Sequence, residues 1–351
     1  MQPAHSTRPG WRRAVRFLTA SASFACVTSL LLFTSGAARA ERPQFILPLA
    51  CTINTDCFVQ TYFDHDPSAG IRDFACGILV RDKHDGIDIR LPNYVAMRKG
   101  VAVLAAAVGT VWKTRDGIED INVNEIGKET VDKYGLGNTV LIDHGDGWVS
   151  IYGHMLKGSV SVKPGDHVEA GQPIGLVGLS GLTSFPHMHF MVHYKGKPVD
   201  PFTGTRDEVA CGDTSHSLWA PSTLAQLVYT PTGLLTAGFA NQEPGREAAR
   251  NGAYDATELP ASSNILTFWV DFFGQQPGDR RMLTLYGPKG QVLAQSNQIA
   301  DDKQDLMFRY VGERAAGGFP PGIYRGEFTL TREVDGTTKT LIAIPRQIEL
   351  K

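Results

Sequence analysis

The chain has 351 residues, of which 42% are hydrophobic, 20% charged and 9% aromatic, and this globular composition excludes disordered, collagen-like and coiled-coil proteins. The formal net charge is −2, but the first 40 residues hold five arginines and no acidic residue, which leaves 29 basic and 36 acidic residues beyond them. Because nucleic-acid binding requires clustered Lys and Arg, this acidic remainder predicts no nucleic-acid partner. The length is large for a single hydrophobic core, so it predicts two domains.

Residues 1–40 have the pattern of a signal peptide. Three arginines precede an uncharged apolar run, Phe17–Phe33, and the small-x-small sequence Ala38-Arg39-Ala40 follows it. An uncleaved membrane anchor is the alternative, but the cleavage pattern comes directly after the run, and we expect cleavage after Ala40. No other stretch approaches the roughly 20 apolar residues of a membrane span. The sequence therefore predicts a chain exported to the periplasm or secreted, without a stable membrane span.

Four cysteines lie beyond residue 40: Cys51, Cys57, Cys76 and Cys211. An even number in an exported chain predicts two disulfides, for which three connectivities exist. We favour Cys51–Cys57, which closes a short turn, together with Cys76–Cys211. A zinc site of four cysteines is the alternative, but no C-x-x-C pair is present. Residues 41–80 are expected to form an irregular lead-in stapled by these disulfides.

Residues 81–203 predict a mostly antiparallel β domain. Gly, Pro and Asp turns separate its expected strands, and the turn Asp143–Gly147 is typical of a hairpin. The expected strands are Val101–Trp112, Asn138–Ile142, Trp148–Tyr152 and His187–Tyr194. The long polar segment Arg115–Gly135 either walls a binding groove or is a solvated decoration, and the sequence favours neither.

The C-terminal part predicts a second all-β unit. Residues 204–261 have weak patterning and are expected to form a transition segment. Short alternating segments over 262–351 predict a β-sandwich that is immunoglobulin-like in architecture only, since it has no cysteine pair. The expected strands are Ile265–Phe272, Met282–Tyr286, Gln291–Ala294, Met307–Val311, Tyr324–Thr331 and Thr340–Leu350.

Histidine placement carries the chemistry. His84 and Asp88, in His84-Asp85-Gly86-Ile87-Asp88, have the same parity and would share one face of a strand. His187 and His189 also lie two residues apart, so they share a face on a strand and diverge on a helix. By contrast, His65 in Asp64-His65-Asp66 is expected to lie in a surface turn.

This donor set indicates a zinc site. Imidazole nitrogen and carboxylate oxygen suit Zn²⁺, and a catalytic zinc uses three protein ligands and keeps one position open. With His154 in the same domain there are four histidines and one aspartate, two groups more than the metal needs. The extra groups would serve as general base and as donor to the developing oxyanion. The residues alone do not say which three bind metal, and the helical H-E-x-x-H motif is absent.

At these residues the sequence resembles the lysostaphin-type, LytM-like zinc metallopeptidases, which cut peptidoglycan peptides. Three blocks match that family in order and spacing over roughly residues 81–202, namely His84-Asp85-Gly86-Ile87-Asp88, Tyr152-Gly153-His154-Met155 and His187-Met188-His189. The resemblance implies that His84, Asp88 and His189 hold zinc. It implies that His154 and His187 are catalytic, and that metal-activated water hydrolyses peptidoglycan cross-links.

Two other classes remain open. One is a non-catalytic envelope regulator that binds a wall amidase, and the other is a secreted zinc peptidase acting on glycine-rich proteins outside the wall. The C-terminal sandwich is expected to bind an envelope partner that the sequence does not identify. A further hypothesis is that the lead-in lies across the groove and keeps the enzyme latent.

Overall fold

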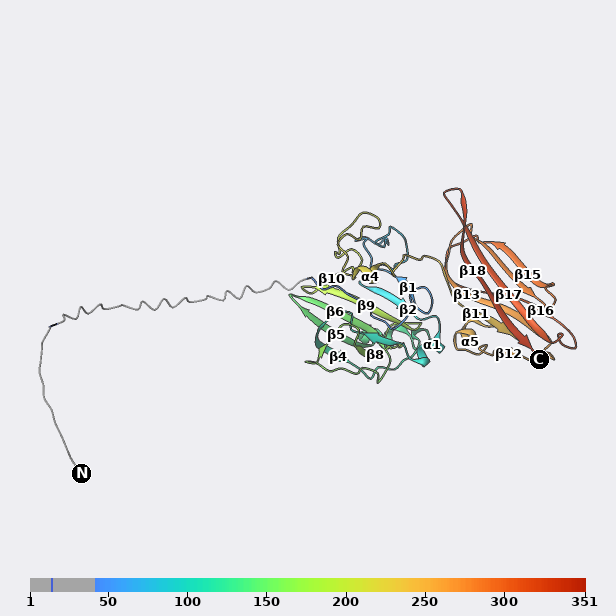
Figure 1. Cartoon of the computed structure of the whole chain (residues 1–351), viewed down its shortest axis with the longest axis horizontal. Helices are drawn as coiled ribbons and strands as arrows, with labels where there is room; N and C mark the ends of the chain where they lie inside the picture. Colours follow the sequence, from blue (N-terminus) through green and yellow to red (C-terminus); the bar gives the residue numbers. More distant parts are fainter. Residues whose placement is uncertain (1–13, 15–41) are drawn as a thin grey trace, which may run out of the picture. The chain divides into compact units, whose positions relative to one another are not determined.

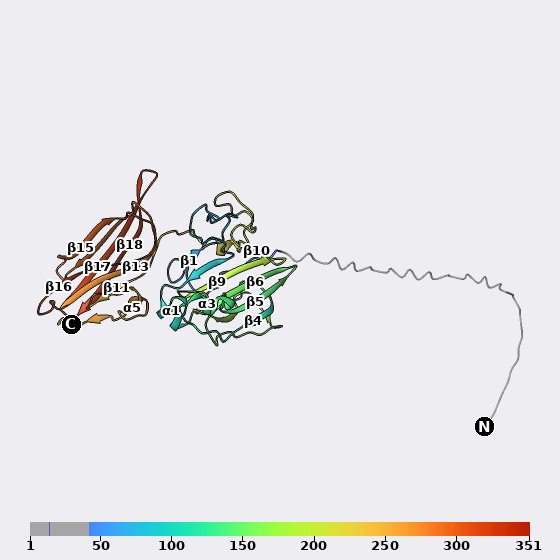
Figure 2. The same cartoon turned by 180° about the vertical axis from the view of Figure 1, so that it is seen from behind.

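The computed structural model describes residue 14 and residues 42–351, and the prediction of a signal peptide lies outside these residues apart from Ala14. Over 42–351 the chain is built from β-strands with a few short helices, so the predicted all-β class is confirmed (Figures 1 and 2). Among these residues no helix has the length and apolar character to cross a membrane.

An eight-stranded antiparallel sheet forms the N-terminal part. Its strand order is β1-β2-β9-β6-β5-β4-β7, with β10 also paired to β9. The strands are β1 (Phe58–Thr61), β2 (Ile87–Arg90), β4 (Gly109–Arg115), β5 (Asn138–Gly145), β6 (Trp148–Met155), β7 (His167–Val168), β9 (His187–Tyr194) and β10 (Lys197–Val199). The predicted strands over 138–142, 148–152 and 187–194 are confirmed.

The central strand β9 shows why this sheet presents a polar face beside an apolar core. Met188, Phe190 and Val192 are fully buried in the main hydrophobic cluster. His187 and His189 alternate with them, so they point to the opposite face of the sheet. The period-2 pattern of β9 thus places His187 and His189 on the face opposite to the main hydrophobic cluster.

The expected strand Val101–Trp112 is wrong as a single element. It divides into β3 (Ala102–Leu104), which pairs with β8 (Pro173–Leu176), and β4, which pairs with β5 and β7. β4 begins at Gly109, where a Cβ would lie 2.6 Å from the Asp143 carbonyl oxygen. Only the absence of a side chain allows this close approach of β4 to β5.

The lead-in is part of the sheet. Its strand β1 pairs with β2 at the sheet edge. Both favoured disulfides are present, Cys51–Cys57 across six residues and Cys76–Cys211 across 135. The second one ties the lead-in to the loop that follows β10.

The polar segment 115–135 contains three short elements, α2 (Val123–Ile126), α3 (Lys128–Val131) and the 3₁₀ turn η1 (Asp132–Tyr134). Its backbone is fixed to the loop before β9, since the Val123 amide donates to the Thr183 carbonyl at 2.9 Å. The side-chain amide of Asn122 also donates to the Ser184 carbonyl at 3.1 Å. The segment therefore supports the loop that leads into His187.

The C-terminal part is a two-sheet sandwich with its own core. Phe272 and Phe328 pack across the two sheets with ring centroids 5.1 Å apart. One sheet has the order β11-β13-β16 and the other β12-β18-β17-β14-β15. The strands are β11 (Gly233–Ala240), β12 (Glu258–Leu259), β13 (Ile265–Gln275), β14 (Arg280–Tyr286), β15 (Val292–Ile299), β16 (Gln304–Arg314), β17 (Gly322–Val334) and β18 (Thr337–Leu350).

Two strands of the sandwich, β11 and β12, come from the segment 204–261, where the sequence pattern is weak. Three short helices accompany the two parts: α1 (Tyr94–Lys99), α4 (Pro221–Leu224) and α5 (Arg246–Arg250). α5 places Arg250 against the buried Asp271 of β13, where the guanidinium Nε donates to the carboxylate at 2.7 Å. A buried carboxylate requires such a partner, and this pair explains a charge inside an otherwise apolar strand.

Candidate functional site

The candidate site lies on three neighbouring strands, β2, β9 and β6. Asp88 of β2 lies directly opposite His189 of β9, and His189 lies opposite Gly153 of β6. His187 precedes His189 by two residues and therefore points to the same face of the sheet. His154 follows Gly153 near the end of β6. Pairing thus brings together residues that are up to 101 positions apart in sequence.

His84 reaches this face by a different route from the expected one. The strand β2 begins at Ile87, so His84 lies in the preceding loop and shared strand parity with Asp88 is the wrong explanation. Its Nδ1–H donates to the Tyr62 carbonyl at 2.6 Å, and this bond fixes the ring. Gly86 permits the turn, because a Cβ there would meet the Phe190 carbonyl at 2.5 Å.

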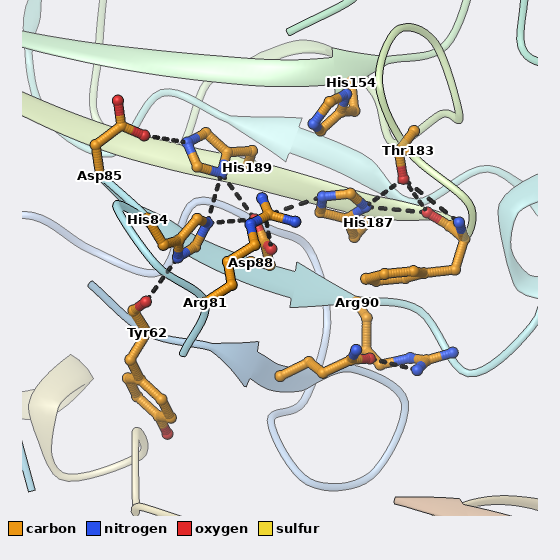
Figure 3. Close-up of polar contacts among 12 residues, drawn as sticks. Tyr62, Arg81, His84, Asp85, Asp88, Arg90, His154, Thr183, His187 and His189 are labelled. Atoms are coloured by element: carbon orange, nitrogen blue, oxygen red, sulfur yellow. Dashed lines mark hydrogen bonds and ion pairs between the residues drawn. The ribbon is translucent and has the colours of Figure 1, made fainter. Parts of the chain in front are cut away.

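Three side chains converge on one point. The Nε2 atom of His84 lies 3.2 Å from the Nδ1 atom of His189 and 3.2 Å from Oδ1 of Asp88. Nδ1 of His189 lies 2.7 Å from the same carboxylate oxygen. All the potential ligand atoms of this set lie within 4.8 Å of one another, and all three residues are buried (Figure 3).

The donor set fits a divalent metal. Two imidazole nitrogens and one carboxylate oxygen are ligands that zinc uses with an open fourth position. Buried polar atoms ordinarily have hydrogen-bond partners. Yet Asp88 Oδ2, His187 Nε2 and His189 Nε2 have none of good geometry among the residues described. Asp88 Oδ2 does face the Arg81 guanidinium at 3.4 Å.

His154 lies beside this set in a strained backbone conformation. Its φ of +57° falls in the left-handed region, which residues other than glycine seldom occupy. The ring is fixed because Nδ1–H donates to the Ser180 carbonyl at 2.7 Å. Burial, followed by the nearby rings of His187 and His189, holds the pKa of His154 well below its usual range. The ring is therefore neutral, with Nε2 free to accept a proton.

His187 is held from its other side. Its Nδ1 lies 3.0 Å from the Thr183 hydroxyl and 3.0 Å from the Phe185 carbonyl. The Phe185 ring stacks on the imidazole with centroids 4.5 Å apart, and the Arg90 guanidinium covers that phenyl ring at 4.7 Å. These contacts direct Nε2 toward Asp88 Oδ1, 3.4 Å away.

The charges at the site are coupled. Burial opposes ionisation of Asp88, but the surrounding rings of His84, His187 and His189 outweigh it and hold the pKa of Asp88 well below its usual range. For His189 burial likewise opposes the charge, and the neighbouring carboxylates of Asp85 and Asp88 raise its pKa to about 9. In the metal-free site His189 therefore carries the proton that balances Asp88.

A cavity of about 450 Å³ opens beside His84 and Asp85. One wall comes from residues 63–67 of the lead-in and the other from residues 206–208 after β10. The lead-in therefore contributes to the site in two ways: through this wall and through the Tyr62 carbonyl that accepts from His84.

The predicted site residues His84, Asp88, His154, His187 and His189 all lie together (Figure 3). The sequence reasoning missed Tyr62, whose backbone oxygen no side-chain pattern reports, and Thr183, which lies in an irregular loop. It also missed Asp85, for which a second acid beside His84 was the available signal.

One histidine prediction is wrong. His65 is only 4% exposed instead of lying in a surface turn, and its Nε2 lies 2.8 Å from the buried carboxylate of Asp200. Its Nδ1 lies 3.0 Å from the Asp207 carbonyl. The Asp200 pair buries this ring, and a sequence pattern around residue 65 cannot report a partner 135 residues away.

Residues 82–201 match Peptidase family M23, and this part of the chain is an M23, LytM-like domain. Among similar curated proteins is the cell division protein DipM of Caulobacter vibrioides, 32% identical over 34% of this chain and 17% of DipM.

Two other relatives have differently worded names. The murein hydrolase activator NlpD of Escherichia coli is 34% identical over 33% of this chain and 24% of NlpD. The DD-carboxypeptidase/endopeptidase Mpg of Neisseria meningitidis is 31% identical over 34% of this chain and 22% of Mpg. The matched region spans less than a quarter of each relative's length.

Proposed function

Because residues 82–201 form a peptidase family M23 domain, we propose that this chain is a zinc-dependent endopeptidase that hydrolyses peptide bonds in peptidoglycan cross-links. His84, Asp88 and His189 are the metal ligands in this proposal, and His154 and His187 are the catalytic residues. The name of Mpg, a carboxypeptidase and endopeptidase, supports an enzymatic role.

One observation carries the proposal. The buried cluster of His84, Asp88 and His189 adjoins two further imidazoles that have their own anchoring hydrogen bonds. A merely structural metal site would be closed by four ligands and would need no such neighbours. When bound, Zn²⁺ supplies a Lewis acid that lowers the pKa of water and polarises the peptide carbonyl.

His154 acts as general base. Because the Ser180 carbonyl holds the proton on Nδ1, the lone pair is on Nε2, the atom that accepts a proton from the attacking water. The neutral state of this buried ring keeps that acceptor available at neutral pH. The hydrogen bond to Ser180 fixes the ring before substrate arrives.

His187 acts on the substrate oxygen. Its Nδ1 is held by Thr183 and Phe185, so Nε2 is the ring atom that faces the site. An N–H donor at this buried position would stabilise a developing oxyanion strongly, because little solvent screens it. The stacked Phe185 ring keeps this donor in place.

The disulfides support an extracytoplasmic site of action. Stable disulfides form in the periplasm and outside the cell, and both pairs among residues 42–351 are closed. Export to the periplasm or the medium is therefore part of the proposal, as is an envelope partner for the sandwich.

The test is mass spectrometry of purified peptidoglycan after incubation with residues 41–351. We expect new peptide ends that identify the cleaved bond, and we expect a zinc chelator to prevent them and added zinc to restore them. Intact peptidoglycan with zinc bound at one per chain would contradict a wall substrate and favour cleavage of another protein.

A second candidate function is a non-catalytic regulator of another wall hydrolase, which the similarity to the activator NlpD favours. The two functions separate in one assay, in which the chain is added to peptidoglycan alone and together with a wall amidase. Stimulation of the amidase without cleavage by the chain itself would support the regulator and contradict the peptidase.

Zinc binding should depend on pH through His189. Below its pKa of about 9 the metal-free ring holds a proton that zinc must displace, whereas above that pKa nothing is displaced. We therefore expect the apparent affinity to rise about tenfold per pH unit from neutral pH and to level off near pH 9. Calorimetry in two buffers of different ionisation enthalpy measures the proton released, and no release at neutral pH would contradict this expectation.

A further inference from the structure

Each candidate metal ligand has a second polar group behind it. The Tyr62 carbonyl accepts from Nδ1–H of His84 at 2.6 Å, and the Arg81 guanidinium faces Oδ2 of Asp88 at 3.4 Å. For His189 the corresponding group is the carboxylate of Asp85, whose Oδ1 lies 3.5 Å from Nε2 (Figure 3). Such outer partners orient ligands and set their tautomers in metal sites.

The orientation of the His189 ring determines which of its two nitrogens can bind a metal and which carries the proton. Nδ1 faces Asp88 and His84, so it is the atom that must be unprotonated to bind a metal. In a neutral ring the proton then lies on Nε2. That atom is buried and has no other partner among the described residues, and an unpaired buried N–H costs about 1–3 kcal/mol.

Asp85 is placed to accept this proton. It precedes Gly86, and a Cβ on Gly86 would lie 2.9 Å from Nε2 of His189, so the glycine keeps the path between the two groups open. The Asp85 side chain is half exposed, which lets a small rotation shorten the 3.5 Å contact to a full hydrogen bond.

We propose that Asp85 is a positioning residue that accepts the Nε2–H of His189 and thereby keeps Nδ1 unprotonated and aimed at the metal. This inference rests on the proposed function, because it assigns a role toward the zinc of that site. In this proposal Asp85 is an outer partner of His189 and is not itself a metal ligand.

The test compares zinc affinity of the chain 41–351 with that of Asp85→Ala, Asp85→Asn and Asp85→Glu. Competition with a chelator measures each affinity at alkaline pH, where few protons compete with zinc for the imidazole ligands. We expect Asp85→Ala to weaken zinc binding about 10–100-fold, Asp85→Asn to weaken it less and Asp85→Glu to recover part of the loss.

The matched control is Asp82→Ala, an exposed acid in the same loop that pairs only with Lys83 among the described residues and should leave zinc affinity unchanged. Long-range ¹⁵N–¹H NMR of the zinc-loaded chain adds a readout that general destabilisation would not move. We expect the Nε2 resonance of His189 to shift in Asp85→Ala.

Two results would distinguish failure of the Asp85 role from failure of the zinc site. Equal zinc affinity and unchanged His189 resonances in Asp85→Ala would overturn the role of Asp85 while leaving the zinc site intact. An unsubstituted chain that binds no zinc would overturn the proposed function itself.

Discussion

Replacing His84 by alanine is expected to abolish zinc binding and peptide hydrolysis together. Nε2 of His84 lies 3.2 Å from both other ligand groups, so its loss leaves two ligands where a catalytic zinc needs three. We expect an effect larger than the 10–100-fold that outer partners are worth. Zinc content by mass spectrometry and cleavage of purified peptidoglycan measure the two losses.

The control for His84→Ala is His167→Ala. His167 lies on the short edge strand β7 with an exposed side chain, and its ion pair with Glu169 spans 3.8 Å. This variant should keep both zinc and activity. His84→Ala that retains peptidoglycan cleavage, with its fold confirmed by circular dichroism, would contradict the assignment of the metal site.

The second large effect concerns the disulfide Cys76–Cys211. Replacing both of its cysteines by serine should destabilise the domain by about 5 kcal/mol, because the bond closes a loop of 135 residues in the unfolded chain. Replacing Cys51 and Cys57 should cost only about 2 kcal/mol, since that loop spans six residues. The short disulfide is therefore the matched control for the long one.

Hydrogen exchange of the β9 amides measures this difference. It reports the opening free energy of the strand that carries His187 and His189, whereas a global unfolding curve would mix this domain with the separately cored sandwich. The long disulfide also ties the loop after β10 to the lead-in, and both of these segments line the cavity at the site. Equal protection losses in the two variants would contradict the chain-entropy argument.

Local sequence spacing determined the strongest features of this protein. The alternation His187-Met188-His189 determines two imidazoles on one face and an apolar residue on the other, since strand side chains alternate regardless of context. The same alternation located most strands of the sandwich. The even number of cysteines beyond residue 40 separately indicated two disulfides. Resemblance to a known family then implied that His154 belongs to the same site.

Tertiary structure alone decided how the rings are held. His84 is outside β2 and depends on the Tyr62 carbonyl, a partner 22 residues away that no side-chain pattern reports. The segment 101–112 divides because β3 pairs with β8 whereas β4 pairs with β5, and local propensity cannot anticipate a change of partner. Local periodicity thus indicated which side chains share the candidate site, whereas burial, tautomer and the proposed role of Asp85 depend on contacts between segments distant in the chain.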